Sequence, residues 1–582
     1  MGTSVKKKIK ITSLNSSAIG AFEIKLSQLK EFVFNDPYLK EELDAAVRRN
    51  VFKKITVFLS VCDKKSRAAV FNGSDYELLD AWNTAVENTR AYIAENNYKT
   101  VWLKADITID WEVIKYEQFK EIISQTREFF YKKGISFDTD FQTALLSEQL
   151  NTMGFINYKR KFLSLPKIRE YFEEKGVDIF KVIPDNIIVF SCSGYFCDEN
   201  KKTYKLYFDE ENYGRRVVNK LDKPFLNNII MKSSHFLSEM VKDDGQFKYG
   251  INSCNNFFFT SYNILRHTGT IWSILMQYQT TNDEALIPKI DSTIKYMLHE
   301  IEYMNDDTAF LVERKSNEIK IGGNAVAIIT LSTYMEVFQT DEYNELVKKL
   351  GNGILMMQEH NGSFYHVLNY PDFSKKERER IVYYDGEAAF ALSKVYGVTK
   401  NEVFLNAAEK AVDYFIKNSY EKYRDHWIAY SINEITKYKP EDKYFSFGLK
   451  NADLNLDRIY NQDTSYHTYM ELLMSTFCLY ERIIENNISV SYMKQFDVKK
   501  FILTIYKRAH HMLNGYLFPE IAMYMESPET VAETFCVRHD SFRIRIDDVQ
   551  HFIGGYFLFL ENFDKLEKYF QEFFSEYTVG QE

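Results

Sequence analysis

The chain has 582 residues, a mass of 68.8 kDa and a net charge of −9, from 73 basic and 82 acidic residues. This length predicts two or more domains, and the balance of 45% apolar to 27% charged residues excludes a disordered chain. A mildly acidic chain without a basic block is not expected to bind nucleic acid.

Cysteine content and apolar runs narrow the class further. The six cysteines are too sparse for a disulfide framework, and the spacing of Cys192 and Cys197 does not fit a zinc knuckle. No apolar run follows the charged N-terminus, which argues against a secretory signal. The longest apolar stretch, Ile321 to Met335, is too short to span a membrane. We therefore expect a cytoplasmic protein without a membrane span, metal or cofactor.

Residues 1–220 alternate between strand and helix patterns, which predicts an α+β N-terminal domain of unknown role. No Gly-rich phosphate loop joins a strand to a helix in this region. We expect strands over 55–62, 67–71 and 101–109, helices over 76–96, 115–132 and 138–150, and a hairpin of 187–190 with 203–208 around Cys192 and Cys197.

From about residue 225 the pattern becomes helix after helix, with a weak internal repeat. Each unit has a small residue, a strongly apolar helix, a short polar linker and an amphipathic helix; three such units start near Gly269, Gly323 and Gly386. The first helix of each unit is apolar nearly all round and should be inner, while the second has one apolar face and should be outer. Outer helices are expected near 225–242, 287–303, 343–358, 403–418, 440–455 and 499–514.

Three further inner helices begin near Asp425, Asp463 and Asp547, which makes six helical hairpins. The predicted fold is therefore mostly α, with a smaller N-terminal α+β domain over 1–220 and an (α/α)6 toroid over 221–582. Inner helices of such a ring run parallel, so their N-terminal ends gather on one face. Helix N-termini expose free N–H groups and a positive dipole end, which favour carboxylates and anions.

Polar residues concentrate at these six helix starts. As single residues, Asp425 and Asp547 fit N-terminal caps, but the set as a whole indicates a functional face. The candidate catalytic residues are Tyr384, Asp385, Glu387, Asp425, His426, Asp463, His467 and Asp547. The candidate substrate-binding residues are Arg266, His267, Asn324, Trp427, Arg538, Arg545 and His551.

Two chemistries fit these residue types. Epimerisation of a uronate needs a base, an acid and a cation for the carboxylate, which Tyr or His residues and Arg266, Arg538 or Arg545 can supply. Glycoside hydrolysis needs two carboxylates, whose separation sets the stereochemical outcome. A zinc site is disfavoured, because only Cys536 lies near His539 in the sequence.

The arginine-rich segment and the tryptophans each allow two interpretations. The segment from Arg538 to His551 fits a latch that closes the ring through ion pairs, or a clamp for a carboxylate or phosphate. Trp272 and Trp427 fit either core packing or stacking on a sugar ring.

Four short segments carry a family resemblance over roughly residues 225–565. Arg266-His-Thr-Gly-Thr, Gly322-Gly-Asn-Ala, Tyr383-Tyr-Asp-Gly-Glu-Ala and Asp425-His-Trp resemble the C-terminal domain of D-glucuronyl C5-epimerase-like bacterial proteins and six-hairpin toroids more broadly. The resemblance implies a toroid, a fold that hosts epimerases, hydrolases, lyases and cyclases.

The sequence thus predicts a carbohydrate-active enzyme that uses acid/base chemistry on an anionic glycan or glycan precursor, of epimerase, hydrolase or lyase type. One alternative is a non-catalytic scaffold or peptide-binding toroid. Another is an enzyme that modifies a peptide or natural product. The expected partner is a glycan or small-molecule substrate, with a protein partner for the N-terminal domain as a further expectation.

Overall fold

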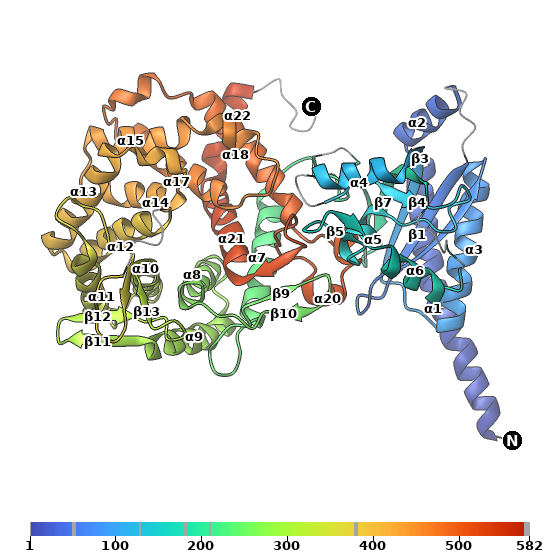
Figure 1. Ribbon diagram of the computed structural model, residues 1–582, viewed down its shortest axis with the longest axis horizontal. Helices are drawn as coiled ribbons and strands as arrows, with labels where there is room; N and C mark the ends of the chain where they lie inside the picture. Colours follow the sequence, from blue (N-terminus) through green and yellow to red (C-terminus); the bar gives the residue numbers. More distant parts are fainter. Residues whose placement is uncertain are drawn as a thin grey trace. The chain divides into compact units, whose positions relative to one another are not determined.

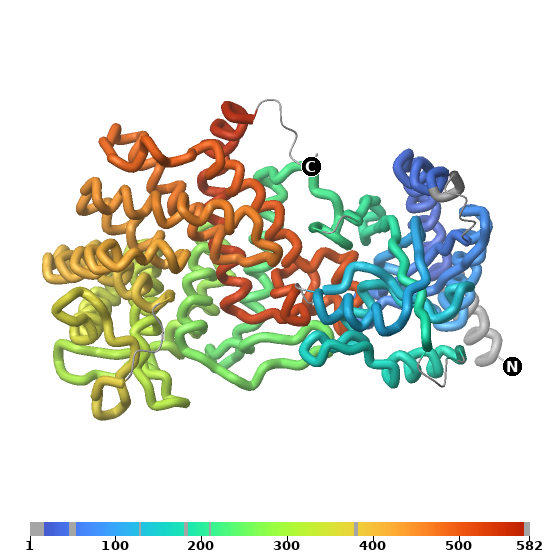
Figure 2. Tube along the Cα trace, turned by 45° about the horizontal axis from the view of Figure 1, so that its top comes forward, coloured from blue at the N-terminus to red at the C-terminus, as the bar shows by residue number. Residues whose placement is uncertain are grey.

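The computed structural model describes residues 2–48, 54–126, 130–177, 179, 184–208, 211–376 and 382–574 (Figures 1 and 2). The chain forms two compact units. The first comprises residues 1–219, 252–257 and 514–543, and the second comprises 220–251, 258–513 and 544–582. The two later segments of the first unit lie beyond the single division at residue 220 that the sequence predicted.

The first unit is built on a six-stranded antiparallel sheet, in the order β2-β1-β3-β7-β4 with β8 also on β7. The central pairs place Leu59 opposite Ala105 and Ala105 opposite Tyr195. The strands are β1 (Ile55–Cys62), β2 (Ala69–Asp75), β3 (Trp102–Lys115), β4 (Gly134–Ser136), β7 (Asn186–Cys197) and β8 (Thr203–Lys205). The helices are α1 (Gly2–Phe34), α2 (Pro37–Arg48), α3 (Leu78–Asn96), α4 (Tyr116–Gln125), α5 (Ser147–Thr152), α6 (Leu165–Glu174), α19 (Pro519–Ala522) and α20 (Pro528–Val531).

Strand alternation divides the sheet into two buried faces. On one face Leu59 and Ala105 pack against Leu29 of α1 and Trp82 of α3. The opposite face packs with residues of the 514–543 segment, such as Tyr524. The short hairpin of β5 (Ile156–Asn157) and β6 (Phe162–Leu163) completes this unit.

Two predictions for this region need correction. The helix expected over 138–150 is confined to Ser147–Thr152, because the Asp138 carboxylate accepts the N–H groups of Asp140, Gln142 and Thr143 and holds a turn. The hairpin of β7 and β8 forms, but both Cys192 and Cys197 lie within β7.

A buried charged cluster sits on β3. The ammonium of Lys104 lies 2.9 Å from both the Asp106 and the Glu148 carboxylates, and all three side chains are buried. Burial, with the Glu148 charge adding, raises the pKa of Asp106 to about 6 against the pull of Lys104. One cation therefore serves two carboxylates, and Asp106 is the one that holds a proton more tightly.

The second unit is a ring of six inner and six outer helices that alternate along the chain (Figure 1). The inner helices are α8 (Ile264–Thr281), α10 (Ile321–Phe338), α12 (Tyr384–Thr399), α14 (His426–Ile435), α17 (Thr468–Glu485) and α21 (Ile546–Glu561). The outer helices are α7 (Lys223–Glu239), α9 (Ile287–His299), α11 (Asn344–Met357), α13 (Glu402–Lys417), α15 (Asp442–Asp453) and α18 (Val498–Met512). Each inner helix packs on the next, and α21 packs on α8, so the ring closes. The (α/α)6 prediction is confirmed.

Shorter elements fill the connections of this unit. They are α16 (Leu456–Tyr460), β11 (Ile301–Asn305), β12 (Thr308–Leu311), β13 (Glu318–Lys320) and β14 (Val367–Asn369). A last helix, α22 (Phe563–Phe574), follows α21 and packs on α18. The strands β9 (Gly250–Asn252), β10 (Phe257–Phe258) and β15 (Arg543–Arg545) contain the residues at which the chain passes between units.

Burial follows the expected difference between inner and outer helices. Every residue of α10 from Ile321 to Thr333 is buried, whereas α13 buries a single stripe that includes Leu405, Ala408 and Val412. By length and composition α10 could cross a membrane, but 78% of it is buried inside the unit, as in the core helix of a ring.

The N-terminal ends of the inner helices lie side by side around the ring. Asp547 of α21 binds Arg266 of α8, and His551 of α21 binds Glu471 of α17. On the other side a Cβ at Gly386 of α12 would stand 2.6 Å from the Ile428 nitrogen of α14, so only glycine permits this approach. A Cβ at Gly322, in the first turn of α10, would likewise collide with Glu387 in the first turn of α12, so all six starts belong to one face of the ring.

The Asp106 cluster predicts a pH dependence of the first unit. Because the folded state holds the Asp106 proton more tightly than the unfolded chain does, stability should fall as pH rises from about 4 to about 6. Asp106→Asn should flatten this decline, by up to a few kcal/mol, since one pKa unit corresponds to about 1.4 kcal/mol. Hydrogen exchange of peptides from β3, followed over this pH range, measures the decline in stability. Asp110→Asn, an exposed change on the same strand, should keep the wild-type slope; an unchanged slope in Asp106→Asn would contradict the assignment.

Candidate active site

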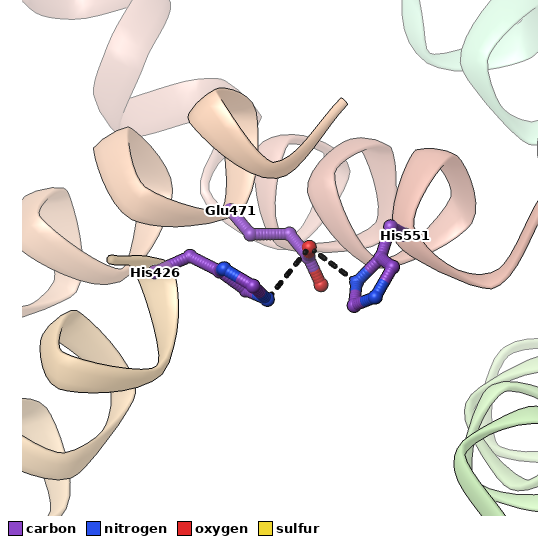
Figure 3. Close-up of side chains that lie close together, drawn as sticks. All are labelled: His426, Glu471 and His551. Carbon is purple, nitrogen blue, oxygen red and sulfur yellow. Dashed lines mark hydrogen bonds and ion pairs between the residues drawn. The ribbon is translucent and has the colours of Figure 1, made fainter. Parts of the chain in front are cut away.

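Two histidines and a glutamate from three neighbouring inner helices meet at this face (Figure 3). His426 is the first residue of α14, Glu471 lies in the first turn of α17, and His551 lies in the second turn of α21. The Glu471 Oε2 atom is 2.7 Å from His551 Nδ1 and 3.7 Å from His426 Nε2. The two imidazole rings stand 5.0 Å apart between centroids and nearly perpendicular.

Glu471 fixes the orientation of His551. The Nδ1–H group of His551 donates to Glu471, and the hydroxyl of Tyr430 donates to the other carboxylate oxygen at 3.2 Å. This leaves Nε2 of His551 as the nitrogen that can exchange a proton with a substrate. Gly554 of α21 provides the room, because a Cβ there would stand 2.7 Å from Glu471 Oε1.

The surroundings shift the pKa values of the two imidazoles in opposite directions. Burial lowers the pKa of His551, but the charge and hydrogen bond of Glu471 outweigh it, with Asp547 and Asp548 adding, so the pKa lies above its usual value. Burial lowers the pKa of His426 well below the usual value, and the two neighbouring histidines lower it further. Of the two, His551 is therefore the imidazole that holds a second proton more readily, and His426 is the one that stays neutral.

His426 is buried without a hydrogen bond. Its side chain is only 1% exposed, and neither ring nitrogen has a hydrogen-bond partner in the part of the chain that the structure describes. A buried polar group without a partner costs about 1–3 kcal/mol, and a catalytic role or a bound water or ion is among the reasons for such a group. The side chain of His551, by contrast, is 16% exposed, so His551 can be reached from solvent.

Tyr383 lies over His426. The rings are 5.3 Å apart between centroids, and the Tyr383 hydroxyl is 3.1 Å from that of Tyr466. The Tyr383 backbone has a φ of 85°, which is strained for a residue with a Cβ, and its N–H donates to the Asp425 carboxylate at 2.6 Å. Backbone strain of this kind clusters at functional sites.

Arginine and aspartate pairs surround the His551 side of the face. Asp547 binds Arg266 at 2.8 Å and Arg545 at 2.8 Å, and Arg545 also approaches Asp548 at 3.3 Å. Burial raises the pKa of Asp547, but the two guanidinium groups overcome it and bring the pKa to about 2. Two cations and two anions neutralise one another here, as the latch interpretation of this segment requires.

Several predicted site residues fix the backbone around the ring. Asp425 caps α14 and accepts the N–H of Trp427, and burial raises its pKa to about 7. Asp385 accepts hydrogen bonds from His366 and Tyr420, each at 3.0 Å.

Two of the predicted substrate-binding residues are also fully engaged inside the protein. His267 accepts from Tyr262 and donates to the Thr293 carbonyl, and burial lowers its pKa to about 4. Asn324 bonds both backbone groups of Leu311. Their polar atoms support packing rather than a ligand.

Other predicted residues are placed near the site or away from it. Trp427 is buried against Trp272, with centroids 5.8 Å apart, which is core packing. Asp463 is exposed. Arg538 belongs to the first unit, where it stacks on Phe130 and donates to the Tyr213 carbonyl.

Three further predicted residues line the same face. Tyr384 and Glu387 are buried in the first turn of α12, against Gly322 at the start of α10. His467 precedes α17, stacks on Phe552 and lies 5.4 Å from His551 between ring centroids.

Sequence reasoning missed Glu471 and Tyr430. Glu471 stands in the apolar run Thr468 to Phe477, where an acidic residue is out of place in a helix that is buried all round. An acidic residue at that position, four residues after the candidate His467, could have identified Glu471 as a site residue. Tyr430 carried no such signal, because an aromatic residue fits a core helix equally well.

Comparisons with known proteins give distant structural likenesses. No protein-family profile and no curated protein matches the chain. A D-mannose isomerase matches with a TM-score of 0.43 and 12% identity, over 59% of this chain and 98% of its own. A cellobiose 2-epimerase from Bacillus thermoamylovorans matches with a TM-score of 0.45 and 13% identity, over 59% of this chain and 100% of its own. A GH76 alpha-mannanase from Bacteroides thetaiotaomicron matches with a TM-score of 0.42 and 11% identity, over 60% of this chain and 98% of its own.

Glu471→Gln should lower the pKa of His551, because the neutral amide removes the carboxylate that stabilises the imidazolium. In the wild type the pair of Glu471 and His551 stabilises the fold below pH 6.5. This contribution is lost as pH rises through the raised pKa that His551 has in the folded state. Histidine-selective NMR titration of the eleven histidines measures the change. Tyr430→Phe, which keeps the charge, should shift His551 less. Equal shifts in both variants would show that Glu471 acts through packing alone.

Proposed function

We propose that the second unit is a carbohydrate-active enzyme that moves a proton at the carbon next to a sugar carbonyl, as isomerases and 2-epimerases do. The observation that carries the proposal is the pair of imidazoles, His426 and His551, held around Glu471 at the starts of adjacent inner helices. Proton transfer at such a carbon needs one group that accepts a proton and another that donates one.

In the proposed reaction, neutral His426 takes the proton from the carbon and protonated His551 gives one to the carbonyl oxygen. The product of this step is an enediol. If His426 returns its proton to the former carbonyl carbon while the hydroxyl on the original carbon gives its proton to His551, the product is the isomer. If a solvent proton reaches the original carbon from the opposite side, while the former carbonyl oxygen returns its proton to His551 and His426 releases its proton to solvent, the product is the epimer. Because Tyr383 lies over His426, its ring has to move before the substrate reaches that nitrogen. Glu471 stabilises the imidazolium of His551 and so acts as a positioning residue.

The charges favour a neutral sugar over a uronate. A uronate needs a cation for its carboxylate, but Arg266 and Arg545 are already paired with Asp547 and Asp548. Glu471 adds a negative charge beside the two imidazoles. This arrangement supports an aldose or ketose as substrate, in place of the anionic glycan that the sequence predicted.

Glycoside hydrolysis has weaker support at this face. It requires a protonated carboxyl group and a second carboxylate that are both open to the glycosidic bond. Asp425 has the raised pKa, but its two oxygens accept backbone N–H groups of Trp427 and Tyr383. Asp547 is held ionised between two arginines.

His426→Gln and His551→Gln should each lower kcat by about 10²- to 10⁴-fold, since each removes one proton-transfer group. NMR of sugar mixtures in ²H₂O measures both turnover and deuterium entry at the carbon next to the carbonyl. His360→Gln changes an exposed histidine and should leave turnover unchanged. Epimer formation without deuterium entry, or full activity in both site variants, would contradict the proposal.

Substrate charge gives a second expected outcome. A neutral aldose such as glucose should have a kcat/KM at least about tenfold above that of the uronate with the same hydroxyl configuration, which corresponds to about 1.4 kcal/mol. The reason is that the uronate carboxylate meets no unpaired guanidinium beside Asp547. Competition between the two sugars in one NMR tube measures the ratio. A preference for the uronate would restore the C5-epimerase expectation.

A further inference from the structure

We propose that His426, Glu471 and His551 also form a binding site for a divalent transition-metal ion such as Zn²⁺. The binding itself is independent of the proposed function; its consequence, inhibition of proton transfer, rests on that function. The two nitrogen ligands and one carboxylate are of the types that bind zinc in proteins.

The ligand atoms are already close together. One atom from each of the three residues lies within 4.8 Å of the other two. Zinc binds imidazole nitrogen and carboxylate oxygen at about 2.0–2.2 Å, so ligand atoms on one ion stand a little over 3 Å apart. The present separation of 3.7 Å between His426 Nε2 and Glu471 Oε2 needs only a small closure, and the 2.7 Å separation to His551 Nδ1 a small opening.

His426 provides an independent reason to expect a ligand. Its ring is buried, it points toward Glu471 (Figure 3), and neither nitrogen is hydrogen-bonded within the residues described. A neutral imidazole in this state offers a lone pair at no cost in broken hydrogen bonds. Only the bond between Glu471 and His551 has to be exchanged for metal coordination.

Groups around the three ligands would support the ion. The Tyr430 hydroxyl donates to the Glu471 oxygen that faces away from His551, and the Asp425 carboxylate lies 3.7 Å from the outer nitrogen of His426. Outer contacts of this kind orient metal ligands and commonly change affinity by about 10- to 100-fold. The neighbouring Arg266 and Arg545 charges are neutralised by Asp547 and Asp548, so they repel a cation little.

A bound ion would occupy the lone pairs of both imidazoles. His426 could then not accept a proton. His551, bound through Nδ1, could no longer be an imidazolium, and it could donate its remaining Nε2 proton only by becoming an imidazolate. Zinc should therefore inhibit the proposed reaction, and a chelator should restore it. The sugar and the metal compete for the same two side chains.

Isothermal titration of the full chain with Zn²⁺, after EDTA treatment and dialysis, tests the binding. We expect one saturable site per chain that weakens at least about tenfold in His426→Gln and in Glu471→Gln, with unchanged binding in His360→Gln. Visible absorption of bound Co²⁺, lost in the same variants, reports the ligand change without relying on affinity. Tyr430→Phe keeps all three metal ligands, so it provides a further variant to measure if one that lacks a ligand fails to fold. Absent saturable binding, or binding that all variants retain, overturns the site.

Sugar turnover with EDTA or with added Zn²⁺ separates this inference from the proposed function. Turnover in EDTA that Zn²⁺ suppresses supports both. Turnover in EDTA without any zinc binding overturns the metal site and leaves the function standing. Zinc binding without turnover under either condition supports the metal site and contradicts the function. Turnover that requires Zn²⁺ overturns the inhibitory role.

Discussion

Closure of the inner ring is the constraint on which the rest of the second unit depends. Each inner helix packs against two inner neighbours and against outer helices, so a helix such as α10 is buried on all sides from Ile321 to Thr333. A polar side chain in the middle of such a helix would lose its water without gaining a partner. Polar chemistry is therefore driven to the helix starts, where unpaired N–H groups and neighbouring starts provide partners. A site at that face follows from the packing of the ring.

Burial at the face then sets the chemistry. Glu471 and His426 are both buried, yet Glu471 gains hydrogen bonds from Tyr430 and His551 whereas the side chain of His426 gains none among the described residues. The same carboxylate that raises the proton affinity of His551 leaves its neighbour unassisted, so two identical side chains 5.0 Å apart differ in basicity. The fold tolerates the cost of an unpaired imidazole because the surrounding aromatic core, including Trp427, holds it in place.

The repeat pattern was sufficient to predict the ring, because inner and outer helices differ in how much of their circumference is apolar. It was also sufficient to place His426 and His551 at one face, since both lie at inner-helix starts. It could not separate the carboxylates that cap or pair, such as Asp425 and Asp547, from the one that works between the imidazoles. That distinction depends on contacts between helices far apart in sequence, which spacing within one helix does not encode. The short α5 likewise reflects a local competition, in which the Asp138 side chain takes the N–H groups that a helix would have used.

The three central side chains carry one negative charge when both imidazoles are neutral, and this limits what can occupy them. A proton satisfies the charge by binding His551, the proposed sugar substrate would engage the lone pairs through its hydroxyl and C–H groups, and the proposed metal ion would satisfy both at once. The arginines beside them could have disturbed this balance, but Asp547 and Asp548 cancel them. The ion pairs at the start of α21 therefore do more than close the ring. They keep the arginine charges from opposing Glu471, so that a neutral or cationic group would be favoured there over an anion.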